Sequence, residues 1–121
     1  MNQTIRQAPG RSWIPKADVF ETDESLIIQV DIPGVDAGRV EVQCERGRLS
    51  ITGERPFSAN TPKRQYYRIE NSYGPFERYF DLPRNVDLDR VAATYHDGVL
   101  TLTIAKVEEA KPKKIIVQVD D

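Results

Sequence analysis

Apolar and polar residues alternate strictly along several short stretches of the chain. In the clearest of them, residues 25–32, every second side chain is Leu, Ile or Val. Successive side chains of a strand point to opposite faces, so this period of two predicts a strand with one buried side. The same alternation predicts further strands at 17–21, 40–45, 49–52, 76–82, 91–95 and 100–104.

Two-residue turns separate two pairs of these strands. They are Arg46-Gly47 and Asp97-Gly98. Asp-Gly is a strong hairpin signal, because a type I′ turn needs a positive φ at both central residues and glycine adopts that conformation freely. The sequence therefore predicts two hairpins.

No stretch carries a helical period over ten or more residues. Residues 85–89 are interpreted as a connector with room for one helical turn, and the apolar stretch 115–119 follows a charged linker, 106–114. Seven or eight short strands with turns about every ten residues predict an all-β protein, an immunoglobulin-like β-sandwich of seven to nine strands.

Residues 54–75 break the pattern, because turn formers and charges replace the alternation. Hairpin loops usually have about two to five residues, so a connection of about twenty is unusual and indicates a functional or disordered segment. Tyr66, Tyr67 and Ile69 form a short β-prone patch inside it. We expect this patch to pair with another strand.

Composition fits one domain in a reducing compartment. The chain has 121 residues, a net charge of −2 and a single cysteine, which leaves no internal disulfide and makes the cytoplasm the expected location. The near-balanced charge argues against a nucleic-acid partner. No run is long enough for a membrane span, and residues 1–11 lack the apolar core of a secretory signal.

Candidate chemistry is sparse. Cys44 lies on the apolar face of a predicted strand and His96 beside a turn. We expect Cys44 to be a core or groove residue and His96 to face solvent, since no orienting motif accompanies either. Neither a metal-ligand set nor a phosphate-binding glycine motif occurs. The sequence thus predicts a non-enzyme without metal or cofactor.

The second hairpin carries a family resemblance. Ala93, Asp97, Gly98, Val99 and Leu100 fit the pattern A-x-x-x-[D/N]-G-V-L, which is similar to the signature of the small heat shock protein (α-crystallin/Hsp20) family. Other stretches that resemble the family's motifs, in the same order, are 17–22 (first core strand), 30–35 (D-[L/I/V]-P-G-[V/F]), 49–55 (L-x-I-x-G-E-R), 73–83 (G-x-F-x-R-x-F-x-L-P) and 115–117 (I-x-[I/V]). Because the long 54–75 segment is present, the chain resembles the bacterial and plant members of the family more than the metazoan ones.

The resemblance implies an ATP-independent chaperone, or holdase, that binds partly unfolded clients and works as a swapped dimer assembling into oligomers. It implies a mobile arm at 1–12, an α-crystallin domain at 13–106 with a dimerisation loop at 54–75, and a C-terminal extension at 107–121. The arm is shorter and more polar than is usual in the family. Client contacts are therefore expected at Trp13, Ile14 and the groove described next.

The resemblance also assigns interface residues. The expected dimer interface is Tyr66, Tyr67, Arg68, Ile69 and Arg78. The expected C-terminal anchor is Ile115 and Val117, docking into a groove formed by Val40, Val42, Cys44, Val91 and Ala93. For Arg78, which lies between two apolar residues of its strand, the alternative is a side chain that reaches past the strand edge into water.

Other interpretations stay open from the residues alone. Residues 54–75 would be a disordered loop in a monomer, and 115–119 would extend the chain's own sheet, in a non-assembling co-chaperone or adaptor of the p23/CS type. A carbohydrate- or ligand-binding sandwich would use exposed aromatics in a row, for which Tyr66, Tyr67 and Tyr73 are the candidates.

Overall fold

The computed structural model of the chain describes residues 12–57 and 64–120. The predicted arm up to residue 11 and the middle of the 54–75 segment lie outside the described residues. The strands are β1 (Ala17–Glu21), β2 (Ser25–Asp31), β3 (Glu41–Glu45), β4 (Arg48–Arg55), β5 (Gly74–Asp81), β6 (Val86–His96) and β7 (Val99–Lys106), with 3-10 turns η1 (Ala37–Arg39) and η2 (Glu108–Ala110). The prediction of an all-β protein is confirmed.

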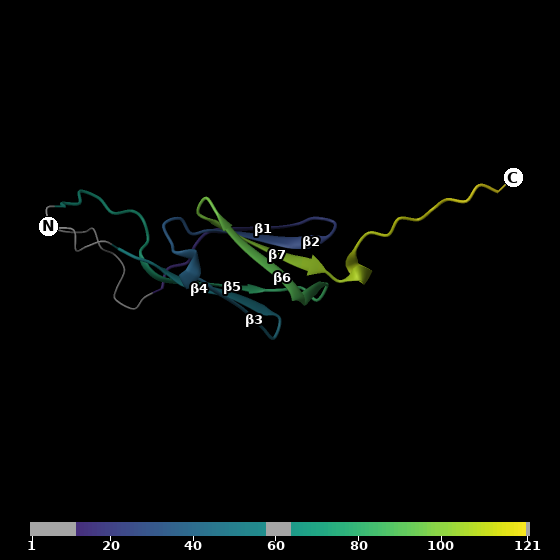
Figure 1. Ribbon diagram of the computed structural model, residues 1–121, viewed down its shortest axis with the longest axis horizontal. Coiled ribbons are helices and arrows are strands. Elements are labelled where there is room, and N and C mark those ends of the chain that lie inside the picture. Colours follow the sequence, from purple (N-terminus) through teal and green to yellow (C-terminus); the bar gives the residue numbers. More distant parts are fainter. Residues whose placement is uncertain (1–11, 58–63, 121) are drawn as a thin grey trace.

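Two antiparallel sheets stack face to face (Figure 1). One has four strands in the order β1-β2-β7-β6, and the other has three in the order β3-β4-β5. The predicted β-sandwich is therefore confirmed, with seven strands in the described part of the chain. Each sheet has two edge strands, whose outer backbone groups have no neighbour within their own sheet.

The core lies between the sheets and follows the alternation in the sequence. Inward residues of β2 and β7 pair directly across the four-stranded sheet, as Ile28 does with Leu102. Both of these side chains are fully buried. The three-stranded sheet contributes Leu49, Ile51 and Phe76 from the opposite side. One-sided burial of both sheets is what the period of two predicts.

Both predicted hairpins form with the expected backbone. Asp97 and Gly98 have φ values of 53° and 81°, and Arg46 and Gly47 have values of 55° and 76°. Positive φ at both central residues is the mark of a type I′ turn. Each turn joins two paired strands, β3 to β4 and β6 to β7.

The predicted connector at 85–89 is wrong, because β6 already begins at Val86. Val86 pairs with Lys106 and Val91 with Ile104, so five residues of β6 span two residues of β7. Residues 87–90 lie in this bulge, where the register shifts and Leu88 is exposed. The alternation of Val86 and Leu88 with two aspartates was a strand signal that sequence reasoning missed.

Residues 13–15, which we call the N-terminal strap, lie along β5. The backbone N–H of Trp13 donates to the carbonyl of Pro75 (3.0 Å), and that of Glu77 donates to the carbonyl of Trp13 (3.3 Å). The indole N–H of Trp13 donates to the carbonyl of Gly74 at 3.0 Å. The strap thereby covers part of the outer edge of β5.

Candidate functional site

Strand β6 is an edge strand whose inward side is incompletely covered. Its residues Val91, Ala93 and Tyr95 pair with the inward, buried residues of β7 and therefore face the same side. Val91 and Tyr95 are half-buried against the core, whereas Ala93 is exposed. The hydroxyl of Tyr95 donates to the carbonyl of Ile32 at 2.9 Å and fixes this ring.

Strand β3, at the edge of the other sheet, repeats this arrangement. Val42 and Cys44 pair with two fully buried residues of β4 and share their inward side. Val40 and Val42 are half-buried against the same core as β6, but Cys44 is exposed. Of the two places expected for Cys44, its exposure excludes the core and leaves the groove, because nothing in the described chain covers the inward side of β3 at that position.

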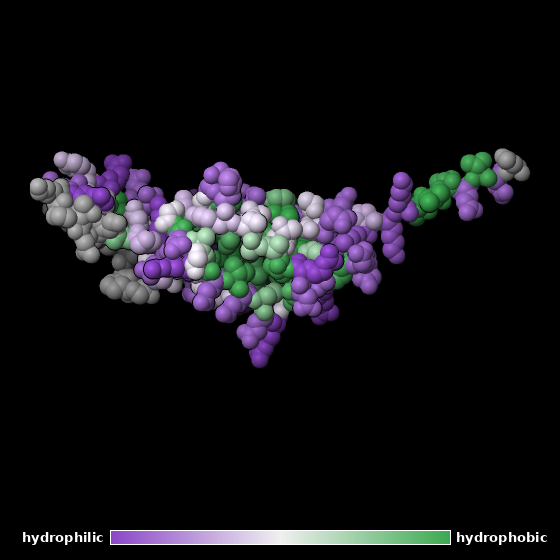
Figure 2. Space-filling view, in the orientation of Figure 1, coloured by the Kyte–Doolittle hydropathy of each residue, from purple (hydrophilic) through white to green (hydrophobic). Residues whose placement is uncertain are grey.

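Both inward sides border the same core, and we refer to them together as the inter-sheet groove. One side consists of Val40, which directly precedes β3, and of Val42 and Cys44 on β3. The other side consists of Val91, Ala93 and Tyr95 on β6. Figure 2 shows hydrophobic surface in the middle of the viewed face, between β6 and the three-stranded sheet. Sequence reasoning named five of these residues and missed Tyr95, although its place two residues after Ala93 was a signal for it.

Residues 113–120 leave the sandwich as an extended chain (Figure 1). Ile115 and Val117 are each 84% exposed, Ile116 is 80% exposed and Val119 86% exposed. Residues 115–119 belong to no strand, so the alternative in which they extend the chain's own sheet is wrong. Four large apolar side chains thus lie in solvent on a free segment, seen in green in Figure 2.

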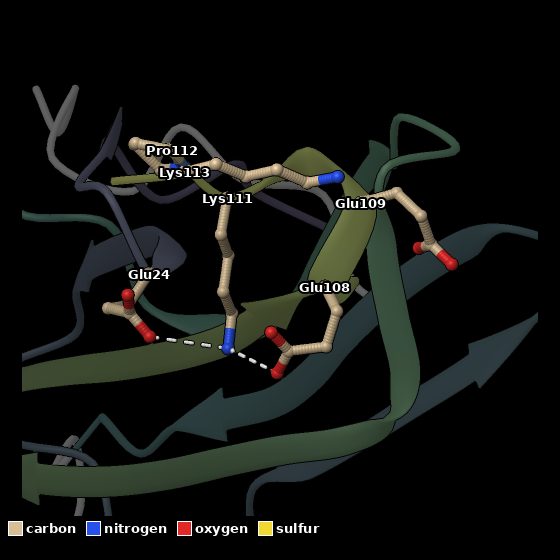
Figure 3. Close-up of a pocket in the computed structure, with 6 residues that line it drawn as sticks. All are labelled: Glu24, Glu108, Glu109, Lys111, Pro112 and Lys113. Carbon is tan, nitrogen blue, oxygen red and sulfur yellow. Dashed lines mark hydrogen bonds and ion pairs between the residues drawn. The ribbon is translucent and has the colours of Figure 1, made fainter. Parts of the chain in front are cut away.

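The extension is held at its root by what we call the Lys111 clamp. The Lys111 ammonium lies 3.2 Å from a carboxylate oxygen of Glu24, in the β1–β2 turn, and 3.1 Å from one of Glu108 in η2 (Figure 3). The Lys111 side chain is only 14% exposed. Hydrogen bonds to Glu108 and Glu24 raise the pKa of Lys111 above its ordinary value.

A neighbouring lysine reinforces the same attachment. Lys106, at the end of β7, is buried and places its ammonium 3.6 Å from a carboxylate oxygen of Glu21 on β1. Its backbone N–H donates to the carbonyl of Glu24 at 2.9 Å. The extension therefore starts from a fixed point on the β1–β2 hairpin. Sequence reasoning missed the pairs with Glu21 and Glu24, because these partners are more than eighty residues from the lysines.

The described part of the 54–75 segment contains no strand apart from its two ends, which belong to β4 and β5. Tyr67 is 96% exposed, and Ile69 is half-buried. Tyr66 and Tyr73 both stack on Phe57, with ring centroids 5.5 Å and 4.8 Å apart. Phe57, which sequence reasoning missed, thus joins the two arms of the segment, and Tyr66 and Tyr73 pack against it with tilted rings, apart from Tyr67.

Arg78 finds a carbonyl partner in its own chain. Its guanidinium donates to the carbonyl of Pro15 in the N-terminal strap at 3.0 Å and lies 4.8 Å from the centre of the Phe80 ring. The side chain is half-buried. One of its five N–H donors is satisfied by this bond, which leaves others for a further partner.

The described residues show no arrangement for catalysis or metal binding. Among them, no group of three or more His, Cys, Asp or Glu side chains lies together. His96 is exposed beside Asp97, with 3.1 Å between Nε2 and the carboxylate. Within the same residues, no helix has the length and apolar character to cross a membrane.

Comparisons with known proteins fit this arrangement. The model of the Hsp20/alpha crystallin family matches residues 18–120. The chain is 41% identical over 110 residues to spore protein SP21 of Stigmatella aurantiaca, and 40% identical over 106 residues to a 17.8 kDa class I heat shock protein of Arabidopsis thaliana. These alignments cover 91% and 87% of this chain but 64% and 68% of the relatives, so the chain spans about two thirds of their length.

Solved structures give the same result. A small heat-shock protein of Xylella fastidiosa matches with a TM-score of 0.75 at 36% identity, covering 90% of this chain and all of that one. The hspA protein of Xanthomonas axonopodis matches with a TM-score of 0.73 at 38% identity, covering 79% and 96%. The chain belongs to the Hsp20/alpha crystallin family, the small heat shock proteins. These proteins are not enzymes, in agreement with the sequence prediction.

Proposed function

We propose that this protein is an ATP-independent holdase, which binds partly unfolded proteins and keeps them soluble. The observation that carries the proposal is the inter-sheet groove, an apolar strip left open between two edge strands, in a chain that also carries a free apolar tail. Such surface is a normal site for binding other polypeptides. Extended segments bind there by adding backbone hydrogen bonds along a free edge.

In this proposal Ile115 and Val117 dock into the inter-sheet groove of another subunit. Burying two such side chains stabilises the docked state by about 1.5–3 kcal/mol each. Ordering three tail residues costs about 1–2 kcal/mol each, so the two contributions nearly cancel. A single docked tail is therefore weak and reversible, and an assembly depends on several tails acting together.

The second contact is a dimer in which residues 66–69 of one chain add to a sheet edge of its partner. Strand β1 is the best receptor, since the N-terminal strap already covers part of β5, and β3 and β6 border the groove. Val19 and Phe20 on β1 are 51% and 45% exposed. An added strand would cover apolar surface as well as satisfy backbone groups.

Charge supports this pairing. Residues 55–69 contain four Lys and Arg residues and no Asp or Glu, whereas residues 17–24 contain four Asp and Glu residues and no Lys or Arg. Two of those acidic residues also contact Lys106 and Lys111. Opposite charge on the two surfaces favours encounter in the correct orientation. Within this interface we place Tyr66, Tyr67, Arg68, Ile69 and the remaining donors of Arg78.

Both contacts are tested by sedimentation of the full chain and its variants. Deletion of residues 58–70 is expected to give monomers, and an unchanged dimer would refute the strand exchange. Replacing both Ile115 and Val117 by Gly is expected to reduce the assembly to dimers. If neither change alters the particle, the protein is a non-assembling adaptor of the p23/CS type.

Holdase activity is tested by light scattering with insulin as client, whose B chain precipitates after reduction. We expect the protein to suppress scattering at an equimolar ratio without any nucleotide. Full aggregation at that ratio would contradict the proposal and favour the adaptor.

The remaining assignments follow from the family and are part of the same proposal. The α-crystallin domain spans 13–106 and the C-terminal extension 107–121, in a cytoplasmic protein. Ile14 is a candidate client contact because it is 70% exposed. Trp13 is a poorer candidate, since its ring stacks on Phe76 at 5.3 Å and its indole N–H already has a partner.

A further inference from the structure

The free tail carries a third apolar side chain on the face of the proposed anchor. In an extended chain, side chains two residues apart lie on the same face, so Val119 shares a face with Ile115 and Val117. Val119 is 86% exposed, at least as much as the other two. Ile116 and Gln118 occupy the opposite face. The three aligned residues repeat about every 6.6 Å, at about 3.3 Å per residue.

The inter-sheet groove offers a matching number of positions. Val40, Val42 and Cys44 succeed one another at the same two-residue spacing along one wall. The opposite wall has Val91, Ala93 and Tyr95, again at two-residue spacing. A two-residue anchor would fill two of these three levels. Cys44 and Ala93 are the exposed members of the two walls, and the other four side chains are half-buried.

We propose that the anchor is the three-residue set Ile115, Val117 and Val119, and that Val119 occupies the third level of the inter-sheet groove of another subunit. This inference rests on the proposed docking of the tail. Docking Val119 buries one more apolar side chain and orders two more residues, and the backbone hydrogen bonds that an extended chain adds along a free edge favour the longer anchor. Val119 suits this role because a β-branched side chain loses little rotamer freedom on docking.

The direction of the tail supports an occupant from a second copy. The Lys111 clamp fixes the root of the extension on the β1–β2 hairpin, and the tail then runs away from both sheets (Figure 1). Ile115 is four positions beyond Lys111, which gives a reach of about 14 Å at about 3.3–3.6 Å per residue. The anchor is therefore presented outward, to a neighbouring subunit.

The test compares three single variants of the full chain by sedimentation velocity over a range of protein concentrations. Val119→Ser is expected to raise the concentration at which larger assemblies form about tenfold, and Val117→Ser at least as much. Ile116→Ser is the matched control, since it removes a side chain of similar size from the opposite face. Its effect is expected to stay below about twofold.

The outcomes separate this inference from the proposed function. If Val119→Ser behaves like Ile116→Ser while Val117→Ser weakens assembly, the anchor has two residues and this inference is wrong. If Val117→Ser also has no effect, the proposed docking fails as a whole. Unfolding curves of the variants should superimpose on that of the parent, because all three side chains lie in solvent outside the sandwich.

The native cysteine provides a second readout. Cys44 lies at one end of the groove, so one end of a three-residue anchor must lie near it. Under mild oxidation, either Ile115→Cys or Val119→Cys is expected to form an intersubunit disulfide with Cys44 several times faster than Ile116→Cys. A faster reaction of Ile116→Cys would place the wrong face of the tail in the groove and overturn the inference.

Discussion

Gly53 on β4 lies directly against the ring of Phe76, which is buried at the centre of the sandwich. A Cβ atom on Gly53 would lie 2.6 Å from Cζ of that ring and 2.9 Å from Cε2. Real carbon contacts are not that short, so the ring would have to move. The glycine in this strand is therefore a packing requirement, because the backbone of β4 and an aromatic ring approach closely.

We expect Gly53→Ala to lower the free energy of unfolding by about 1–3 kcal/mol, the usual cost of overpacking a core. Gly38→Ala is the control, since its Cβ would have an ordinary 3.5 Å contact with Asp36. Urea unfolding at one fixed protein concentration measures both. Equal values for the two variants would show that Phe76 can shift without cost.

Arg46, in the turn between β3 and β4, has a backbone conformation that does not suit its residue type. It has a φ of 55°, a conformation in which Asn and Asp are much more common than other non-glycine residues. The other hairpin has Asp97 at the equivalent place. Arg46→Asn is therefore expected to stabilise the fold by about 0.5–1 kcal/mol. Asp97→Arg should have the opposite effect, and a loss of stability in Arg46→Asn would contradict this explanation.

Among the elements, η2 and the extension depend on the Lys111 clamp for their position. The raised pKa of Lys111 means that the ammonium form is favoured in the folded state. The clamp is therefore fully present at neutral pH, below the unfolded pKa of lysine, and is lost only as the pH rises through the raised value. It should also weaken as salt screens its exposed carboxylates.

Lys111→Met keeps the aliphatic stem and removes both ion pairs. We expect the amides of residues 108–111 to exchange with deuterium about two- to fivefold faster, because local opening becomes easier while the sandwich is unaffected. Lys113→Met is the control, as it leaves both ion pairs in place. Identical exchange in the two variants, measured by mass spectrometry, would show that the backbone turn holds the extension without the clamp.

The proposed dimer pairs residues 66–69 of one chain with β1 of its partner, and this pairing should depend on salt. If a basic segment adds to an acidic strand, raising sodium chloride from about 50 to 500 mM should weaken the dimer about three- to tenfold. Sedimentation equilibrium measures the dissociation constant at each salt concentration. A constant value would mean that the apolar contacts of β1 alone hold the dimer.

For the whole molecule, the proposed assembly and client binding compete for one groove. The Ile115→Gly and Val117→Gly double variant leaves the groove open in every subunit. It should therefore suppress insulin aggregation at a lower molar ratio than the parent protein, by about twofold or more. A variant that suppresses aggregation less well would indicate that clients bind elsewhere, with Ile14 as the next surface to test.

Features of the fold that depend on local sequence pattern could be predicted, and features that depend on distant parts of the chain could not. The strands of the core could be predicted, because strands buried on one side have apolar residues at every second position, as in Leu26–Val30 and Leu100–Ile104. The start of β6 was missed although Val86 and Leu88 alternate with aspartates, since the stretch is short and the bulge that shifts its register cannot be recognised from the sequence. The open inward sides of Ala93 and Cys44 depend on what the opposite sheet leaves uncovered. The pairs of Lys106 with Glu21 and of Lys111 with Glu24 depend on residues far away in the sequence, which no local pattern shows.

The N-terminal strap has a spectroscopic consequence. The chain contains a single tryptophan, and its indole is half-buried and hydrogen-bonded at the edge of β5. Intrinsic emission excited at the indole band therefore reports one local event, the seating of the strap on Phe76. A red shift on warming, at temperatures where the circular dichroism of the sheets is unchanged, would mark release of the strap ahead of unfolding without any added label.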